Sequence, residues 1–175
     1  QLIKYHIYKI SNFLDKNYLQ ELKKAVFSPD TPWFFRESIT DYKKDEEKYW
    51  YNHNIYSEQE PKSGLFPHIK IVLNKLNAVA INEIRVNSMN SLKEHYECEW
   101  HVDKNFKCKT AILYLNTWNG YTLLKTNPET KINTIENRIV IFNSELKHKA
   151  VSATDTKRRI LINFNYFDSP CALTT

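Results

Sequence analysis

The sequence predicts a mainly β protein, an antiparallel sandwich or jelly roll braced by helices on one face. Three observations support this prediction. Two segments in the first half carry the apolar spacing of amphipathic helices, and seven short strand-like runs separated by turn residues follow from about residue 79. Helices and strands do not alternate along the chain, which argues against a parallel α/β fold.

Helices are expected in two places. The segment DKNYLQELKKAVF opens on Asp15, a suitable N-cap, and repeats Leu19, Leu22 and Val26 at helical spacing. A second helix is expected to begin near Pro67, because proline suits the first turn of a helix. Between the two, residues 30–56 mix aromatic and charged side chains and are expected to form strands joined by a long, functional loop.

The strands are expected in the runs AVAINEIRVNSM, KTAILYLNT, YTLLKT, KINTI, NRIVIF, HKAVSA and RRILINFNYF. Asn119 and Gly120 are expected to form a two-residue type I′ turn, because both central residues of that turn need a positive φ. The segment TNPET supplies a second reversal between two short strands.

The composition indicates one soluble domain. Only two glycines and six prolines occur in 175 residues, so neither a flexible linker nor a disordered tail is indicated. The apolar runs are far shorter than the roughly 20 residues of a membrane span, and no signal-peptide pattern opens the sequence. We therefore expect a cytoplasmic protein without a membrane partner. Residues 1–78 are expected to provide helical support and an aromatic-rich loop, and residues 79–167 the jelly-roll core that carries the site.

Charge pattern and cysteine content argue against two kinds of site. The net charge is +5, but lysines lie beside acidic residues, as in DYKKDEEK. This pattern is typical of a solvated mixed-charge surface, so a nucleic-acid partner is not expected. The cysteines are odd in number and lack CxxC spacing, which argues against a disulfide framework and a thiolate zinc site; they are Cys98, Cys108 and Cys171.

A histidine and an aspartate stand one residue apart in the segment EWHVDK. Residues i and i+2 of a strand project to the same side, so His101 and Asp103 would converge while Val102 turns into the core. Such pairs also arise by chance, so a third ligand is needed. His148 is the candidate, because it begins a strand-like run directly after NRIVIF. Two histidines and one carboxylate suit Fe(II), Mn(II) or Zn(II), and both non-heme iron oxygenases and zinc hydrolases use such ligands.

Two arginines begin the last strand-like run. Arginine forms bidentate hydrogen bonds with carboxylates, so an arginine beside the metal is the expected anchor of a dicarboxylate such as 2-oxoglutarate. Alternate residues of a strand face opposite sides, so only one of the pair faces the site. Arg159 shares its face with Asn163 and Asn165 and is preferred. Arg158 lies on an apolar face that is expected to pack against the helices, and it remains the alternative.

The blocks HVD, ILYLNTWNGYT, NRIVIF, LKH and RRILINFNYF resemble, in this order, the C-terminal core of the Fe(II)- and 2-oxoglutarate-dependent oxygenases. The nearest likeness is to small bacterial and phage-encoded members related to prolyl hydroxylases, and it covers about residues 84–167. The resemblance implies a double-stranded β-helix, a cupin-like jelly roll. It also implies His101, Asp103 and His148 as iron ligands and Arg159 as the partner of the cosubstrate's distal carboxylate. A phage-encoded member would act in the host cytoplasm.

The resemblance implies further contacts and a reaction. Tyr114 matches a position that hydrogen bonds the same carboxylate, and Thr122 matches a position lining the cosubstrate pocket. Family members commonly carry paired glycines where this chain has Asn119 and Gly120. The implied reaction uses Fe(II), 2-oxoglutarate and O2, with ascorbate as an accessory reductant. It hydroxylates a substrate C–H bond and releases succinate and CO2. A peptidyl proline or an amino acid is favoured as the peptide or small-molecule substrate.

Several side chains are candidates for the substrate side of the site: Trp100, Trp118, His95 and Asn163. Aromatic residues of the 30–56 segment are further candidates, although core packing is the more common role of such residues; they are Trp33, Phe34, Phe35, Tyr49, Trp50 and Tyr51. Each has an ordinary alternative. His95 suits an exposed loop, and Asn163 suits a strand residue bonded to its neighbours.

Two other functions remain open at this level. A catalytically silent jelly-roll binding module would keep the fold and bind metal without turnover. A nucleic-acid demethylase of the same family is favoured only by the basic charge, and it would need a base-accepting pocket and phosphate contacts.

Overall fold

Two antiparallel sheets face each other in the part of the chain that the computed structural model describes, residues 6–40 and 48–169. The larger sheet has the strands, in spatial order, β1 (Tyr8–Ile10), β9 (Ile139–Asn143), β6 (Lys109–Tyr114), β11 (Arg158–Asp168), β5 (Ala78–Asn90), β3 (Trp50–Ser57) and β2 (Phe34–Arg36), with β4 (Glu60–Pro61) paired to β3. The smaller sheet has the strands β10 (His148–Val151), β7 (Tyr121–Leu124) and β8 (Thr130–Asn133). The mainly β prediction is confirmed, and the fold is a jelly-roll double-stranded β-helix.

The first helix, α1 (Lys16–Val26), begins at the expected residue. The carboxylate of Asp15 accepts hydrogen bonds from the backbone N–H groups of Asn17 at 2.9 Å and Tyr18 at 3.4 Å. These bonds satisfy two of the amides that a helix start leaves without intrahelical partners. The apolar stripe of the helix is buried, so capping and periodicity together define this element.

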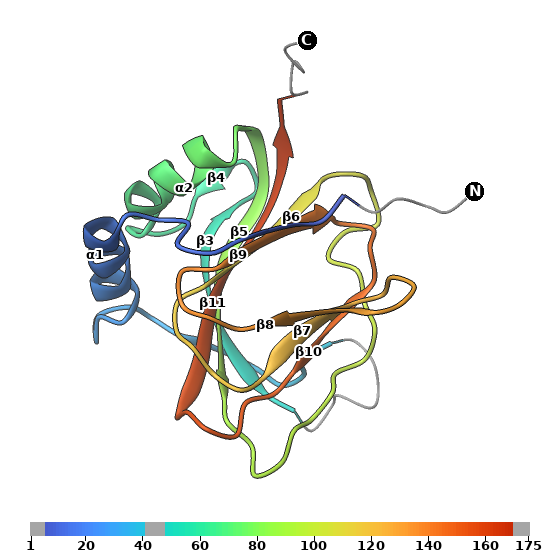
Figure 1. The fold of residues 1–175 in the computed structure, drawn as a ribbon. Helices are drawn as coiled ribbons and strands as arrows, with labels where there is room; N and C mark the ends of the chain where they lie inside the picture. Colours follow the sequence, from blue (N-terminus) through green and yellow to red (C-terminus); the bar gives the residue numbers. More distant parts are fainter. Residues whose placement is uncertain (1–5, 41–47, 170–175) are drawn as a thin grey trace.

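The second helical region is divided. Pro67 lies in a 3₁₀ turn, η2 (Phe66–Ile69), which continues directly into α2 (Lys70–Lys75). Figure 1 shows both α1 and α2 on the side of the larger sheet that faces away from the smaller sheet. One hydrophobic core fills the space between these helices and the larger sheet, and a second core lies between the two sheets.

The side chains of strand β11 alternate between the two cores, so the strand contributes to both. Ile160, Ile162 and Phe164 are fully buried in the core beneath the helices. Arg159 and Asn163 face the smaller sheet, as the alternation predicts. In register across the ladder, β11 and β5 pair Arg159 with Met89, Leu161 with Asn87 and Asn163 with Arg85.

The prediction of a two-residue type I′ turn at Asn119 and Gly120 is wrong. The segment leads from β6 of the larger sheet to β7 of the smaller sheet, so its flanking strands do not pair, and neither residue has a positive φ. Gly120 is required by close approach instead. A Cβ at this position would overlap the backbone oxygen of Val151 and would lie 2.9 Å from the carbonyl carbon of Ser152. The second expected reversal is present, because β7 and β8 form an antiparallel pair.

The first 78 residues contribute strands as well as helices. The 30–56 segment supplies β2 and β3, as expected, while residues 41–47 of its loop lie outside the described residues. Strands β1 and β4 were not anticipated from the sequence. In the described ranges, no helix has the length and apolar character needed to cross a membrane.

Candidate metal centre and pocket

His101, Asp103 and His148 come together, with one ligand atom of each within 4.8 Å of the others. His101 and His148 form an isolated antiparallel bridge, with backbone hydrogen bonds of 3.0 and 2.9 Å. Asp103 follows in a bend, so the chain leaves the bridge at once and does not continue as a strand. The prediction that Val102 turns into the core is therefore wrong, since this residue is 36% exposed.

The two imidazole rings are oriented by backbone carbonyls. His101 Nδ1 lies 3.0 Å from the carbonyl oxygen of Glu99, and His148 Nδ1 lies 3.2 Å from that of Leu146. A ring that donates from Nδ1 presents the lone pair of Nε2, as metal-binding histidines commonly do. His148 Nε2 lies 3.4 Å from Asp103 Oδ1, so these atoms face a common point.

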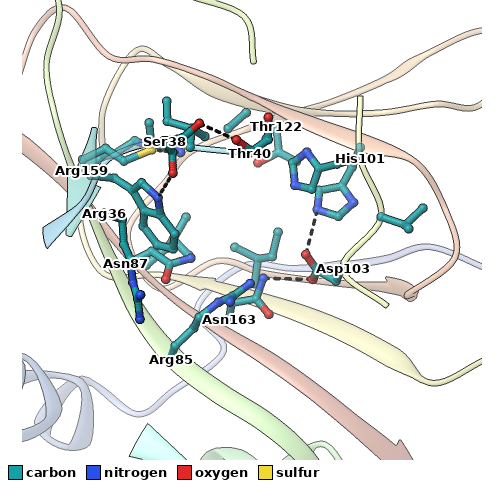
Figure 2. Close-up of a pocket in the computed structure, with 18 residues that line it drawn as sticks. Arg36, Ser38, Thr40, Arg85, Asn87, His101, Asp103, Thr122, Arg159 and Asn163 are labelled. Atoms are coloured by element: carbon teal, nitrogen blue, oxygen red, sulfur yellow. Dashed lines mark hydrogen bonds and ion pairs between the residues drawn. The ribbon is translucent and has the colours of Figure 1, made fainter. Parts of the chain in front are cut away.

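The carboxylate of Asp103 is held through one of its two oxygens. Oδ2 accepts hydrogen bonds from Thr110 Oγ1 at 3.1 Å, Asn163 Nδ2 at 3.0 Å and Asn165 Nδ2 at 3.2 Å. Oδ1 is the oxygen that faces His148 Nε2, and Asp103 is labelled at the edge of the cavity in Figure 2. Three fixed donors on one oxygen therefore aim the other oxygen at the point between the histidines.

Electrostatics favour an ionised Asp103 and a neutral His101, whereas Asp103 favours the protonated form of His148, whose proton a metal ion would have to displace. Burial raises the pKa of Asp103, but the charge and hydrogen bond of His148 and the charge of Arg85 outweigh it, so this pKa lies well below its ordinary value. Burial lowers the pKa of His148, but Asp103 outweighs that effect, so this pKa is raised. Burial and the neighbouring His148 lower the pKa of His101. Two nitrogen donors and one ionised carboxylate fit Fe(II), Mn(II) or Zn(II).

A cavity of about 540 Å³ opens beside the three side chains, a size typical of small-ligand sites. Its wall on the larger sheet includes Arg85, Asn87 and Met89 of β5 and Arg159, Leu161 and Asn163 of β11. Figure 2 shows Arg159 on one side of this cavity and His101 and Asp103 on the other. The Arg159 guanidinium of β11 and the cluster of His101, Asp103 and His148 thus border one space.

Arg159 is a buried cation in the wall of this cavity. Its side chain is 5% exposed, and Nε and Nη2 donate to the sulfur of Met89 at 3.1 and 2.6 Å. Its Cζ lies 5.9 Å from the ring centre of Trp118, and no acidic side chain of the described residues pairs with it. Burying a charge is costly unless an opposite charge compensates it. The cavity therefore offers a place for a carboxylate.

Arg158 points to the other side of the sheet. Its guanidinium lies 5.7 Å from the ring centres of both Phe27 and Trp33, near α1. It does not line the cavity, so the strand alternation distinguishes the two arginines as the sequence predicts.

Thr122 lines the cavity, and Tyr114 lies behind it. The two hydroxyl groups are 2.8 Å apart, and Tyr114 is fully buried. Burial raises the pKa of Tyr114 to about 12, so the phenol stays neutral and keeps its hydrogen-bonding proton. Trp118 packs edge-on against Tyr114 at 5.7 Å and is 3% exposed, so this candidate belongs to the core and not to the cavity wall.

The other substrate-side candidates lie outside the cavity lining, with two exceptions. Trp100 lies beneath Lys125 and Lys149, and His95 is an exposed residue whose Nδ1 lies 2.7 Å from a backbone carbonyl. Asn163 lines the cavity, and Trp50 is the one residue of the aromatic segment's candidates that does so in the described ranges.

Sequence reasoning missed several residues of this site: Arg36, Arg85, Asn87, Met89 and Thr110. The alternation in NEIRVNSM places Arg85, Asn87 and Met89 on one face, so part of the signal was present. Which strand lies beside them is a long-range property, and no local pattern indicated it.

Comparisons with known proteins agree on the fold. No protein-family model matches the sequence, and no curated protein matches it. Among solved structures, an oxidoreductase of the 2OG-Fe(II) oxygenase family from Burkholderia pseudomallei is similar, with a TM-score of 0.69 and 12% identity over 92% of this chain and 84% of that one. A prolyl hydroxylase from Trichoplax adhaerens, in complex with a hypoxia inducible factor peptide fragment, has a TM-score of 0.63 and 17% identity over 93% and 83%. A Pseudomonas putida prolyl-4-hydroxylase has a TM-score of 0.59 and 12% identity over 95% and 94%.

Proposed function

We propose that this protein is an Fe(II)- and 2-oxoglutarate-dependent oxygenase that hydroxylates a substrate C–H bond. The observation that carries the proposal is the pairing, in one cavity, of a two-histidine, one-carboxylate cluster with a buried arginine that has no acidic partner in the described part of the chain. A zinc hydrolase would use the same ligand types, but its chemistry does not call for a buried guanidinium across the cavity.

Each residue has a defined task in this proposal. His101, Asp103 and His148 hold Fe(II), and Arg159 binds the distal carboxylate of 2-oxoglutarate, with Thr122 and the Tyr114 hydroxyl beside it. Bound iron supplies the activation of O2, so that substrate R–H, O2 and 2-oxoglutarate give R–OH, succinate and CO2, with ascorbate as an accessory reductant.

The surrounding side chains orient and shield the reactants. The amides of Asn163 and Asn165 fix the carboxylate of Asp103 through its outer oxygen. Ile112 and Leu161 give the cavity an apolar portion that limits water around the reacting groups. The whole chain acts as one domain in the cytoplasm, with the strands of residues 79–167 carrying the site.

The substrate class follows by analogy with the structural neighbours. The Trichoplax adhaerens prolyl hydroxylase is described in complex with a peptide fragment, and the Pseudomonas putida protein is described as a prolyl-4-hydroxylase. A peptidyl proline or an amino acid is therefore the proposed substrate, and neither a membrane nor a nucleic acid is a proposed partner.

Anaerobic titration with Fe(II) and then 2-oxoglutarate tests the proposal. Chelation of iron by the keto acid gives a weak visible charge-transfer band. We expect the band in the wild-type protein and in His95→Ala, which alters an exposed histidine outside the cavity, and its loss in His148→Ala. Iron binding without the band would support a silent binding module or a hydrolytic metal site instead.

A further inference from the structure

The cavity keeps an excess of positive charge after the proposed Fe(II) and 2-oxoglutarate are counted. Among the described residues, its lining contains three arginines, Arg36, Arg85 and Arg159, and one acidic side chain, Asp103. With neutral histidines the lining has a net charge of +2, and Fe(II) together with the 2-oxoglutarate dianion leaves this charge unchanged. Arg159 is assigned to the cosubstrate, so Arg36 and Arg85 are the arginines that remain.

Arg85 is built into the wall next to the metal ligands. It lies on β5 in register with Asn163 of β11, whose amide binds Asp103. Its guanidinium lies 5.9 Å from the ring centre of Trp50, a second cavity residue. The indole N–H of Trp50 donates to the backbone oxygen of Ser38 at 2.6 Å, which fixes the ring beneath the guanidinium. Arg85 is thus positioned on the side of the cavity near the candidate metal ligand Asp103.

Among the described residues, Arg85 has one long acidic contact and one buried N–H group without a partner. Its acidic contact in the described residues is Glu83 Oε1, 3.5 Å from Nη1, and the other oxygen of Glu83 is bound by Lys104 at 2.7 Å. The Nε of Arg85 is buried and has no hydrogen-bond partner among the described residues. A guanidinium held over a ring, with a long and shared ionic contact, retains the capacity to bind an anion.

Arg36 supports the same role from the neighbouring part of the sheet. It is an exposed residue of β2 that lines the cavity, and its Nε donates to Asn52 Oδ1 at 3.2 Å, which anchors the side chain. Asn52 is 6% exposed and pairs in register with Asn87 of β5. The side-chain oxygens of Asn87 and Asn163 in this wall are buried and accept no hydrogen bond from the described residues, which suits a ligand that carries N–H or O–H donors.

We propose that Arg85, assisted by Arg36, binds a carboxylate of the substrate, so that the substrate is a small molecule with a free carboxylate, namely a free amino acid. This inference rests on the proposed function and narrows it. An internal peptidyl proline presents a neutral amide at the corresponding point, so it would offer neither arginine a charged partner. A free amino acid places its carboxylate on Arg85 and its ammonium group near the amide oxygens of Asn87 and Asn163.

The test uses the protein loaded anaerobically with Fe(II) and 2-oxoglutarate. One probe is the mixture of the twenty L-amino acids, a second is the same amino acids as C-terminal amides, and a third is the glycyl dipeptides with free C-termini. Saturation-transfer NMR identifies which components bind, and titration of the best acid and its amide gives the two affinities. The variants are Arg85→Gln, Arg36→Gln and, as a matched control, Arg138→Gln, whose arginine bonds to Ser11 away from the cavity.

We expect a free amino acid to bind about 10- to 100-fold more tightly than its amide, the worth of a charge-assisted bidentate contact. Arg85→Gln should reduce acid binding to the level of the amide, Arg36→Gln should reduce it less, and Arg138→Gln should leave it unchanged. Equal binding of acid and amide, full acid binding in Arg85→Gln, or the absence of any bound component overturns the proposal. Binding of a dipeptide acid without any free amino acid overturns the amino-acid assignment.

A separate measurement distinguishes failure of the proposed oxygenase function from failure of the proposed carboxylate site. The charge-transfer band without any probe tests iron and cosubstrate binding, whereas the NMR comparison of acids and amides can also be made on the metal-free protein. A missing band together with acid binding that depends on Arg85 would overturn the oxygenase and keep the carboxylate site. A normal charge-transfer band without preference for acids over amides would overturn the carboxylate site and keep the oxygenase.

Discussion

Arg159 donates two hydrogen bonds, of 3.1 and 2.6 Å, to the sulfur of Met89, the residue directly opposite it on β5. A thioether is a weak acceptor, so the contact orients the guanidinium without neutralising it. An incoming carboxylate replaces this weak partner with a charged, bidentate one. The pair therefore keeps the arginine in position while leaving most of its binding capacity for a ligand.

Replacing Arg159 with alanine should raise the apparent KM for 2-oxoglutarate by about 10- to 100-fold, with a smaller effect on kcat, because a bidentate charged contact is lost. Succinate formation at varied 2-oxoglutarate concentrations measures this change. Arg158→Ala is the matched control and should leave the KM unchanged, since Arg158 lies over Phe27 and Trp33. A larger cosubstrate effect in Arg158→Ala would show that the two faces of β11 are assigned the wrong way round.

Asn165→Ala should weaken metal binding by about 10- to 100-fold, as loss of a group that orients a ligand commonly does. Asn165 is 1% exposed and donates to the outer oxygen of Asp103, so its removal lets the carboxylate turn away from the histidines. Anaerobic titration with Fe(II) or Co(II) gives the affinity. The exposed Asn133→Ala serves as the control, and equal affinities in the two variants would remove Asn165 from the site.

Tyr114→Phe should change how stability depends on alkaline pH. The phenol ionises at its ordinary pKa of 10.0 when unfolded, but burial raises its pKa to about 12 in the folded protein. The folded state holds this proton longer, so wild-type stability falls as the pH rises from about 10 to about 12, by about 1.4 kcal/mol per unit. The phenylalanine variant lacks this loss. It should be about 1 kcal/mol less stable than wild type at neutral pH, because the bond to Thr122 is gone.

Urea unfolding at pH 8 and pH 11 measures both parts of this prediction. The difference between the wild-type protein and the variant should shrink or reverse at the higher pH. If the difference stays constant, the phenol titrates alike in the folded and unfolded states, and its burial does not have the stated effect.

Gly120→Ala should lower the free energy of unfolding by about 1–3 kcal/mol, the usual cost of forcing an atom into a filled space. The added methyl group would meet the backbone of Val151 and Ser152, which cannot move aside as a flexible side chain can. Gly64→Ala is the control, because no heavy atom lies within 4 Å of a Cβ there. Its stability should be unchanged or higher by up to about 1 kcal/mol. Similar unfolding curves for both variants would contradict the close approach.

Local patterns predicted those parts of the molecule that local forces determine. The capping of α1 by Asp15 and the two faces of β11 follow from side-chain chemistry and a two-residue period, and both are confirmed. The turn at Asn119 and Gly120 failed because a dipeptide indicates only that the chain bends, whereas the sheet that receives the next strand depends on distant partners. The role of Arg85 escaped notice for the same reason, since only the β5–β11 register brings it beside Asn163.

Because side chains of β11 alternate between the core beneath the helices and the cavity, the two sets of residues can evolve independently. Its even-numbered side chains from Ile160 to Phe164 support the helices, and its odd-numbered side chains from Arg159 to Asn163 face the cavity. The two faces of the strand are therefore under separate selection. Substitutions at the odd-numbered residues can change ligand preference, while the even-numbered residues keep the core beneath the helices intact. A saturation mutagenesis of residues 158–166 should show abundance and ligand binding each varying with a period of two, out of phase with one another.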